Sequence, residues 1–268
     1  MVTAASPETA SETASNPAAS RGARRQRSGR DRAGADGEGL AISLQAVGKT
    51  YPGGRIALRD VDLVVPEGDF VFLVGPSGAG KSTLIKLLIR DELPTRGQVK
   101  VAGQDLTRLK RGDVPKLRRK IGIVFQDYKL LPNRSVRGNV AFALEVTGTP
   151  RRRIGPDVDR VLKLVGLSEQ ADNLPHELSG GEQQRTAIAR AMVHDPRLFI
   201  ADEPTGNLDP VISWEIIQLL LHINAMGVTV LMATHNAEVV TALRKRVVAL
   251  EAGRIVRDAV GAAYHRED

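Results

Sequence analysis

The feature that most constrains the fold of this chain is a glycine-rich segment between an apolar run and a helical pattern. Residues 69–74 (DFVFLV) predict a short buried strand, and residues 81–89 predict a helix. The segment that joins them reads Gly75, Pro76, Ser77, Gly78, Ala79, Gly80, Lys81 and Ser82. A strand, a loop with this glycine spacing and a helix form a phosphate-binding arrangement, so the sequence predicts an α/β fold.

The residue types in this loop fit the chemistry of a phosphate site. Glycines let backbone N–H groups approach phosphate oxygens, and the helix that begins near Lys81 points its positive end at the same place. Lys81 supplies a charge for the β- and γ-phosphates, Ser82 offers a hydroxyl to Mg²⁺, and Thr83 adds a second hydroxyl. A chance glycine-rich turn is the alternative, and the match along the whole motif counts against it.

Two adjacent acids follow another apolar run. Residues 198–201 (LFIA) predict a strand that ends at Asp202 and Glu203. A carboxylate at Asp202 can meet Mg²⁺ through its water shell, and Glu203 can take a proton from an attacking water or orient it. Adjacent acids after a strand can also cap a helix or face solvent, and the phosphate loop upstream favours the catalytic interpretation.

A second anion site is predicted at residues 178–185 (LSGGEQQR). Ser179 and Glu182 fit a capping box at a helix start, but that role does not explain Gly180 and Gly181. A helix N-terminus with a free hydroxyl and exposed amides binds anions. Because residues 75–82 already serve the nucleotide of this copy, the second site is best explained by ATP bound to another copy, in a head-to-tail dimer.

The remaining pattern alternates strands and helices. Further strands are expected at residues 41–47, 56–65, 121–125, 228–232 and 246–250, and helices at about 182–194 and 211–224. This alternation favours a parallel sheet with helices on its faces.

The predicted domain covers residues 39–260. Within it, helical patterns punctuated by Pro, Gly and Arg predict an inserted helical subdomain at about residues 127–190. Residues 1–38 are expected to be a disordered, basic, low-complexity tail, and residues 261–268 a C-terminal tail.

Composition limits the remaining function classes. The chain has no cysteine, which excludes disulfides and cysteine-based zinc sites. No apolar stretch approaches the roughly 18 residues of a membrane span, and no secretory signal is present, so we expect the protein in the cytoplasm. The net charge of +7 allows attraction to nucleic acid or anionic lipid, and a basic solvated surface explains it as well.

Residues 178–185, followed by residues 198–203 (LFIADE), resemble the signature of the ATP-binding cassette (ABC) ATPases, and the likeness extends from about residue 40 to 257. The resemblance implies a P-loop NTPase fold of the ABC cassette type, with a mostly parallel core sheet, an N-terminal antiparallel β region and the inserted helical subdomain. It implies ATP and Mg²⁺ as cofactors, and hydrolysis of ATP to ADP and phosphate by a homodimer.

The resemblance also assigns roles to single residues. It implies that Tyr51 stacks on adenine, that Gln126 senses Mg²⁺ and the attacking water, and that His235 contacts the γ-phosphate. Residues 206–209 (GNLD) match the loop that crosses the dimer seam. Asn236 departs from the pattern, because many relatives carry an acid there. The implied metal-site residues are Ser82, Gln126 and Asp202, and those implied to hold the other copy's ATP are Ser179, Gly180, Gly181 and Glu182.

Within this superfamily, several stretches resemble the FtsE family of cell-division ATPases. They are residues 105–110 (DLTRLK), 114–119 (VPKLRR), 121–128 (IGIVFQDY) and 228–235 (VTVLMATH), and residues 139–146 (NVAFALEV) resemble its actinobacterial branch. The resemblance implies an FtsX-like integral membrane partner and ATP-driven control of peptidoglycan hydrolysis. It implies a place on the cytoplasmic face of the cell membrane, with the division septum as the expected location.

Three alternatives stay open at this point. An ATPase of a lipoprotein- or macrolide-exporter type shares most of these motifs. The basic segment 108–120 fits either contact with anionic headgroups or a solvated helix face. A nucleic-acid-associated ABC protein is disfavoured, because the chain has one cassette and no long coiled coil between Lys81 and Asp202, so nucleic acid is not an expected partner.

Overall fold

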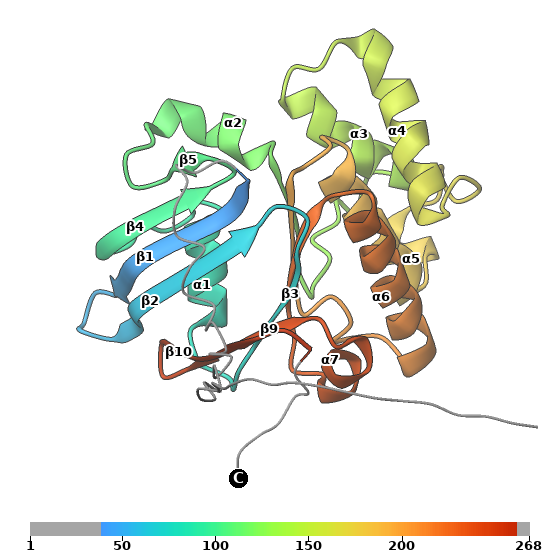
Figure 1. Ribbon diagram of the computed structural model, residues 1–268. Helices are drawn as coiled ribbons and strands as arrows, with labels where there is room; N and C mark the ends of the chain where they lie inside the picture. Colours follow the sequence, from blue (N-terminus) through green and yellow to red (C-terminus); the bar gives the residue numbers. More distant parts are fainter. Residues whose placement is uncertain (1–38, 262–268) are drawn as a thin grey trace, which may run out of the picture. The chain divides into compact units, whose positions relative to one another are not determined.

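The computed structural model describes residues 39–261. The predicted N-terminal tail and residues 262–268 of the predicted C-terminal tail lie outside the described residues. Between them, two β-sheets and a set of helices make up the fold (Figure 1).

The first sheet is antiparallel, with the strand order β2-β1-β4-β5. Its strands are β1 (Leu40–Thr50), β2 (Ile56–Pro66), β4 (Arg96–Val101) and β5 (Gln104–Asp105). β1 pairs with two neighbours, so that Leu44 lies opposite Leu63 of β2 and Val99 of β4. In β2 the buried Val61, Leu63 and Val65 alternate with exposed residues, and one face of this sheet therefore covers the core.

The second sheet has the strand order β10-β9-β3-β8-β7-β6. Its members are β3 (Phe70–Val74), β6 (Ile121–Val124), β7 (Leu198–Asp202), β8 (Thr229–Ala233), β9 (Arg246–Glu251) and β10 (Arg254–Ala259). All neighbours pair in parallel except β9 and β10. Every residue of β3 and β8 is buried, as expected for central strands that are covered on both faces.

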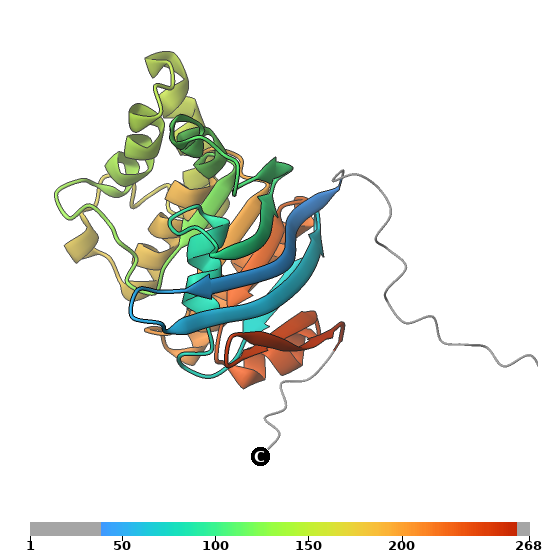
Figure 2. The ribbon, with the colours of Figure 1, turned by 90° about the vertical axis from the view of Figure 1, so that its left-hand side faces the viewer.

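Helix α1 (Lys81–Leu88) lies between the two sheets (Figure 2). Its buried Leu84 and Leu88 belong to a core cluster that also contains Leu44 of the first sheet and Leu73 of the second. Because β3 runs directly into the loop before α1, this packing holds that loop in place.

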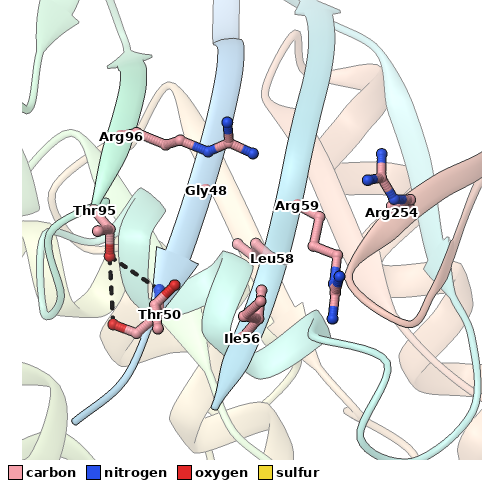
Figure 3. Close-up of a pocket in the computed structure, with 8 residues that line it drawn as sticks. All are labelled: Gly48, Thr50, Ile56, Leu58, Arg59, Thr95, Arg96 and Arg254. Carbon is pink, nitrogen blue, oxygen red and sulfur yellow. Dashed lines mark hydrogen bonds between the residues drawn. The ribbon is translucent and has the colours of Figure 1, made fainter. Parts of the chain in front are cut away.

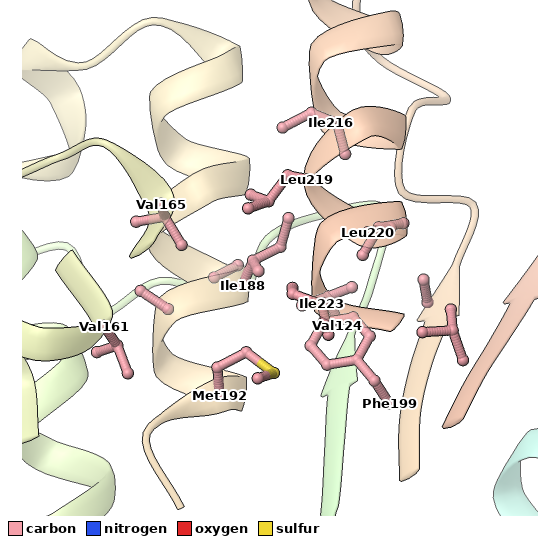
Figure 4. Packing of buried hydrophobic residues seen from close by; sticks show 14 of the residues in the cluster. Val124, Val161, Val165, Ile188, Met192, Phe199, Ile216, Leu219, Leu220 and Ile223 are labelled. Carbon is pink, nitrogen blue, oxygen red and sulfur yellow. The ribbon is translucent and has the colours of Figure 1, made fainter. Parts of the chain in front are cut away.

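Helices α5 (Gly180–Met192) and α6 (Pro210–Ala225) cover the opposite face of the second sheet. Figure 4 shows Ile188 and Met192 of α5 and Ile223 of α6 close to Phe199 of β7. A shorter helix, α7 (Ala237–Leu243), follows β8.

The segment between β6 and β7 is helical. It contains α3 (Val136–Val146), α4 (Arg151–Val165), the 3₁₀ turn η2 (Pro175–Glu177) and α5. Another 3₁₀ turn, η1 (Arg111–Asp113), and helix α2 (Val114–Arg118) lie between β5 and β6. In Figure 1, α3 and α4 lie at the end of the fold opposite to β10 and α7.

The predicted α/β fold is confirmed, with its mostly parallel core sheet, antiparallel β region and inserted helices. Within residues 39–261, none of the helices combines the length and apolar character needed to cross a membrane.

Candidate active site

A cavity of about 660 Å³ opens at the carboxyl ends of the parallel strands. β3, β7 and β8 end at this edge, and each is followed by polar residues that the sequence singled out. Open parallel sheets bind ligands at this edge. The lining residues are Tyr51, Arg55, Ile56, Ala57, Gly75, Pro76, Ser77, Gly78, Ala79, Gly80, Lys81, Ser82, Thr83, Lys86, Gln126, Asp202, Glu203 and His235.

The loop before α1 packs so tightly that two of its positions exclude a side chain. Gly75 has φ +146°, and a β-carbon there would collide with the backbone oxygen of Leu250. Gly80 has φ +114°, and its β-carbon would lie 2.7 Å from the backbone oxygen of Ala57. Gly80 also caps α1 without any side-chain hydrogen bond, so the first N–H groups of the helix face the cavity uncapped.

Lys81 points back over the loop. Its Nζ donates to the backbone oxygen of Gly75 at 2.6 Å and lies 3.3 Å from that of Pro76. The ammonium and the helix N-terminus therefore converge on one spot, which suits an anion of phosphate size.

Asp202 and Glu203 lie at the end of β7 in different environments. Burial, reinforced by the neighbouring charge of Glu203, raises the pKa of Asp202 above its usual value. Glu203 has a left-handed backbone with φ +50°. Its Oε2 lies 2.9 Å from Nδ1 of His235 and accepts the backbone N–H of His235 at 3.4 Å.

The donor set fits a divalent cation only in part. Within residues 39–261, no group of three or more His, Cys, Asp or Glu side chains could hold a metal ion alone. The three residues predicted to hold the metal, the carboxylate Asp202, the hydroxyl Ser82 and the amide Gln126, do line the cavity. Such a sparse oxygen set suits Mg²⁺, which keeps several waters and takes further ligands from substrate phosphates.

Gln126 is held by two hydrogen bonds to Asn207. Its Nε2 donates to Oδ1 of Asn207 at 3.1 Å, and Nδ2 of Asn207 donates to the backbone oxygen of Gln126 at 3.2 Å. A β-carbon at Gly206 would lie 2.9 Å from the Gln126 amide. The segment 206–209 therefore touches the cavity through Gln126.

Tyr51 lines the mouth of the cavity. Its hydroxyl lies 3.4 Å from Oγ1 of Thr83, and the guanidinium of Arg55 lies 5.1 Å from the ring centroid. Arg55 and Lys86 are cavity residues that the sequence reasoning missed, because neither belongs to a motif.

The second predicted anion site does not line this cavity. Ser179 caps α5, with Oγ accepting from the Glu182 N–H at 3.3 Å while Glu182 Oε2 accepts from the Ser179 N–H at 2.8 Å. The Ser179 hydroxyl also donates to Oε2 of Glu182 at 2.7 Å, and this bond, together with that from the Ser179 N–H, lowers the pKa of Glu182. β-Carbons at Gly180 and Gly181 would meet Leu208 and Ile212, so the start of α5 lies beside the segment 206–209.

A groove of about 380 Å³ adjoins the cavity. Glu203 and His235 line both hollows, and the groove continues over Leu208, Trp214 and Val239. A group that fills the groove would therefore contact Glu203 and His235, which also line the cavity.

A smaller hollow of about 250 Å³ lies on the antiparallel sheet (Figure 3). Arg59, Arg96 and Arg254 line it, and Asp60 pairs with two of these arginines. None of the predicted site residues lines it.

Comparison with known proteins gives one family and many relatives. Residues 58–206 match the family described as ABC transporter. The chain is 54% identical over 227 residues to the cell division ATP-binding protein FtsE of Streptococcus pneumoniae, covering 85% of this chain and 99% of the relative. It is 52% identical to the protein of the same name in Mycobacterium tuberculosis, covering 84% of this chain and 98% of the relative. Identity to that of Escherichia coli is 47%, covering 80% of this chain and 96% of the relative.

Solved structures share the fold. One is a dimeric structure of a post-hydrolysis state of the ATP-binding cassette MJ0796 bound to ADP and Pi. It is 35% identical, with a TM-score of 0.73, and the match covers 83% of this chain and 100% of the MJ0796 chain. The structure of cbiO1 from Clostridium perfringens, part of the ABC transporter complex cbiONQ, is 31% identical, with a TM-score of 0.78 and coverage of 84% and 90%.

Proposed function

The chain belongs to the ABC transporter family of ATPases, and from this premise we propose that it is the ATP-hydrolysing subunit of an FtsEX-type complex that acts in cell division. The observation that carries the ATPase part is the meeting of the phosphate loop, Gln126, Asp202, Glu203 and His235 around one cavity. The cell-division part is supported by 54% identity over 99% of an FtsE relative. We take residues 39–260 as the ATPase domain, with its helical subdomain at about 127–190.

The phosphate loop binds the triphosphate. Free N–H groups at the start of α1 and the Lys81 ammonium bind the β- and γ-phosphates, which displaces Lys81 from the loop carbonyls it contacts now. Tyr51 stacks on the adenine at the cavity mouth. Ser82, Gln126 and Asp202 would hold Mg²⁺, and its charge would offset the charge that develops on the phosphate oxygens.

Glu203 activates the attacking water, and His235 controls when the Glu203 carboxylate is available to do so. The carboxylate of Glu203 contacts His235, whose side chain is 71% exposed. A γ-phosphate offers His235 a stronger acceptor, and the released carboxylate can take the proton of the water.

A second copy completes each site. Ser179, Gly180, Gly181 and Glu182 lie at a helix start outside their own cavity, and we assign them to the ATP of the partner copy. The dimeric state of the MJ0796 cassette supports this arrangement. Closure of the dimer on two ATP molecules is the motion that the complex transmits.

An FtsX-like membrane protein receives that motion and controls peptidoglycan hydrolysis. The protein then acts on the cytoplasmic face of the membrane, at the division septum. The basic segment 108–120 supports contact with anionic lipid, because Arg108 is 86% exposed although it pairs with Asp105, and no ion pair is seen for Lys110 or Arg111 within residues 39–261.

The test is a membrane pull-down with the full-length Glu203→Gln variant in MgATP, followed by mass spectrometry. We expect an FtsX-like protein with four membrane spans. Recovery of a lipoprotein- or macrolide-exporter permease would keep the ATPase and replace the division role. Recovery of ribosomes or nucleic acid without membrane protein would contradict the membrane role altogether.

A further inference from the structure

The loop that carries Gln126 contains two consecutive residues with a left-handed backbone. Tyr128 has φ +55° and Lys129 has φ +50°, and neither is a glycine. This conformation disfavours residues with a β-carbon, so neighbouring contacts must hold the turn. Inside the turn, the Tyr128 N–H donates to the backbone oxygen of Phe125 and the Lys129 N–H donates to that of Asp127, and neither bond uses the carbonyl oxygens of Tyr128 and Lys129 themselves.

Arg190 binds these two carbonyl oxygens. Its Nη1 donates to the backbone oxygen of Lys129 at 2.6 Å, and its Nη2 donates to that of Tyr128 at 2.9 Å. A planar guanidinium can address two adjacent carbonyls at once, which an ammonium cannot do with the same geometry. Burial lowers the pKa of Arg190, and no carboxylate pairs with it within residues 39–261. Its hydrogen bonding is therefore directed at this turn.

The same turn also touches the other end of α5. Arg190 lies in the last turn of α5, whereas Gly180 is its first residue. A β-carbon at Gly180 would lie 3.3 Å from the hydroxyl oxygen of Tyr128. The Tyr128 side chain thus runs along the helix, and the turn is attached to α5 near both of its ends.

α5 consequently connects two proposed sites. Its N-terminus, capped by Ser179, is the surface assigned to the ATP of the second copy. Gln126, two residues before Tyr128, lines the cavity of the chain's own ATP. While Arg190 stays hydrogen-bonded to Tyr128 and Lys129, a displacement of the start of α5 must also move the loop that carries Gln126.

We propose that Arg190 is a positioning residue that couples the docking of a second copy's ATP at Ser179 to the placement of Gln126 in the chain's own cavity. The inference rests on the proposed ATPase dimer and adds a route between its two sites. Arg190 touches neither nucleotide; it acts through the turn at Tyr128 and Lys129.

The test is a double-mutant cycle in the full-length chain that combines Arg190→Lys with Gln126→Ala. We expect Arg190→Lys to lower kcat by about tenfold in the wild-type background and by less than about twofold in the Gln126→Ala background. The Kd for ATP should stay unchanged. The dependence of the rate on ATP concentration should become less sigmoidal, because the two sites no longer communicate.

Arg185→Lys is the matched control. Arg185 lies on the same helix and also donates two hydrogen bonds, one to the backbone oxygen of Val165 and one to Glu215. It does not bind the turn at Tyr128 and Lys129. Its replacement should cause the same small change in both backgrounds. Equal losses for Arg190→Lys in both backgrounds, or matching effects of the two lysine variants, would overturn the proposal.

A wild-type chain that does not hydrolyse ATP would instead contradict the proposed function, so the two failures are distinguishable. If Arg190→Lys does not fold, Arg190→Met enters the same cycle, because it leaves no buried charge. Loss of the folded state in both variants would make Arg190 a stability residue and would also overturn the proposal.

Discussion

Glu203 differs from an ordinary surface acid in its backbone and in its partner. It adopts φ +50°, a conformation that costs a non-glycine residue roughly 1–2 kcal/mol, and its carboxylate faces His235 at 2.9 Å. Its side chain is 17% exposed, so water has limited access to it. A strained residue at the end of a catalytic strand is a typical way of fixing the direction of a reacting group.

Replacement of this carboxylate should separate binding from hydrolysis. We expect Glu203→Gln to slow ATP turnover by roughly 10²–10⁴-fold, because an amide cannot accept the proton of the attacking water. The Kd for ATP should not rise, since the phosphate loop is untouched. Single-turnover hydrolysis and equilibrium binding measure the two effects, and normal turnover in the variant would remove Glu203 from the mechanism.

In the nucleotide-free protein, the buried carboxylate of Asp202 should lower the free energy of unfolding at neutral pH. Burial raises its folded-state pKa, so the folded chain holds a proton over a pH range in which the unfolded chain has lost it. The free energy of unfolding therefore falls as pH rises from the ordinary carboxyl pKa, about 3.9, through the raised value. Asp202→Asn removes this penalty.

We expect the Tm of Asp202→Asn to exceed that of the wild type at pH 7 in EDTA, with a difference that shrinks as pH falls below both pKa values. Addition of MgATP should reverse the order, because only the wild type has the Asp202 carboxylate to bind the cation. A pH-independent Tm difference would show that the titration of Asp202 is not its source.

The sequence could predict the residues of the cavity that belong to motifs, because their spacing carries the chemistry. Arg55 and Lys86 could not be found in this way, and Arg190 looks like a solvated residue of a helix. Its role depends on where Tyr128 and Lys129 point their carbonyls, which only tertiary packing decides. The two hydrogen bonds of Asn207 to Gln126 are hidden for the same reason.

At the scale of elements, the buried strands were the easiest to predict. β3, β7 and β8 are continuous apolar runs at the centre of a sheet, and their predicted bounds agree with the structure to within one residue. β4, β5 and β10 were not predicted. β5 has two residues, β4 contains a glycine with φ +82°, and β10 is a half-exposed edge strand rich in charge, so none shows a clear apolar period.

The contact between α5 and α6 depends on a missing side chain. A β-carbon at Gly181 would lie 2.5 Å from Cγ2 of Ile212, so α6 packs directly on the backbone of α5. We expect Gly181→Ala to lower the free energy of unfolding by about 1–3 kcal/mol, as overpacked cores do. Urea denaturation measures the change.

A compensating variant tests the cause of that loss. Ile212→Ala in the Gly181→Ala background removes the clashing methyl group, so the double variant should be more stable than the sum of the two single losses predicts. Strict additivity would show that the two residues do not meet as the structure has them.

At the scale of the whole molecule, the shared lining of cavity and groove gives a reporter of the proposed dimer closure. Trp214 is the only tryptophan of the chain, is 42% exposed and lines the groove together with Glu203 and His235. Since a second copy that brings ATP to Ser179 also covers the adjoining segment 206–209, it should change the surroundings of Trp214.

We expect MgATP to shift the fluorescence of Glu203→Gln to shorter wavelength, with a midpoint that depends on protein concentration, because the indole loses water contacts on association. Lys81→Ala should show no shift, since it cannot hold the phosphates. A shift whose midpoint does not depend on protein concentration would assign the change to a single copy.

The separation of Ser179 from its own phosphate cavity has a consequence for inheritance. A chain with Lys81→Ala still presents a sound Ser179 surface, and a chain altered at Ser179 still has a sound phosphate loop. In the proposed dimer, a mixed pair of the two holds one complete site and one that is defective on both sides. Two alleles that are each inactive alone can therefore restore partial function when they are expressed together, whereas two alleles damaged on the same side of the seam cannot.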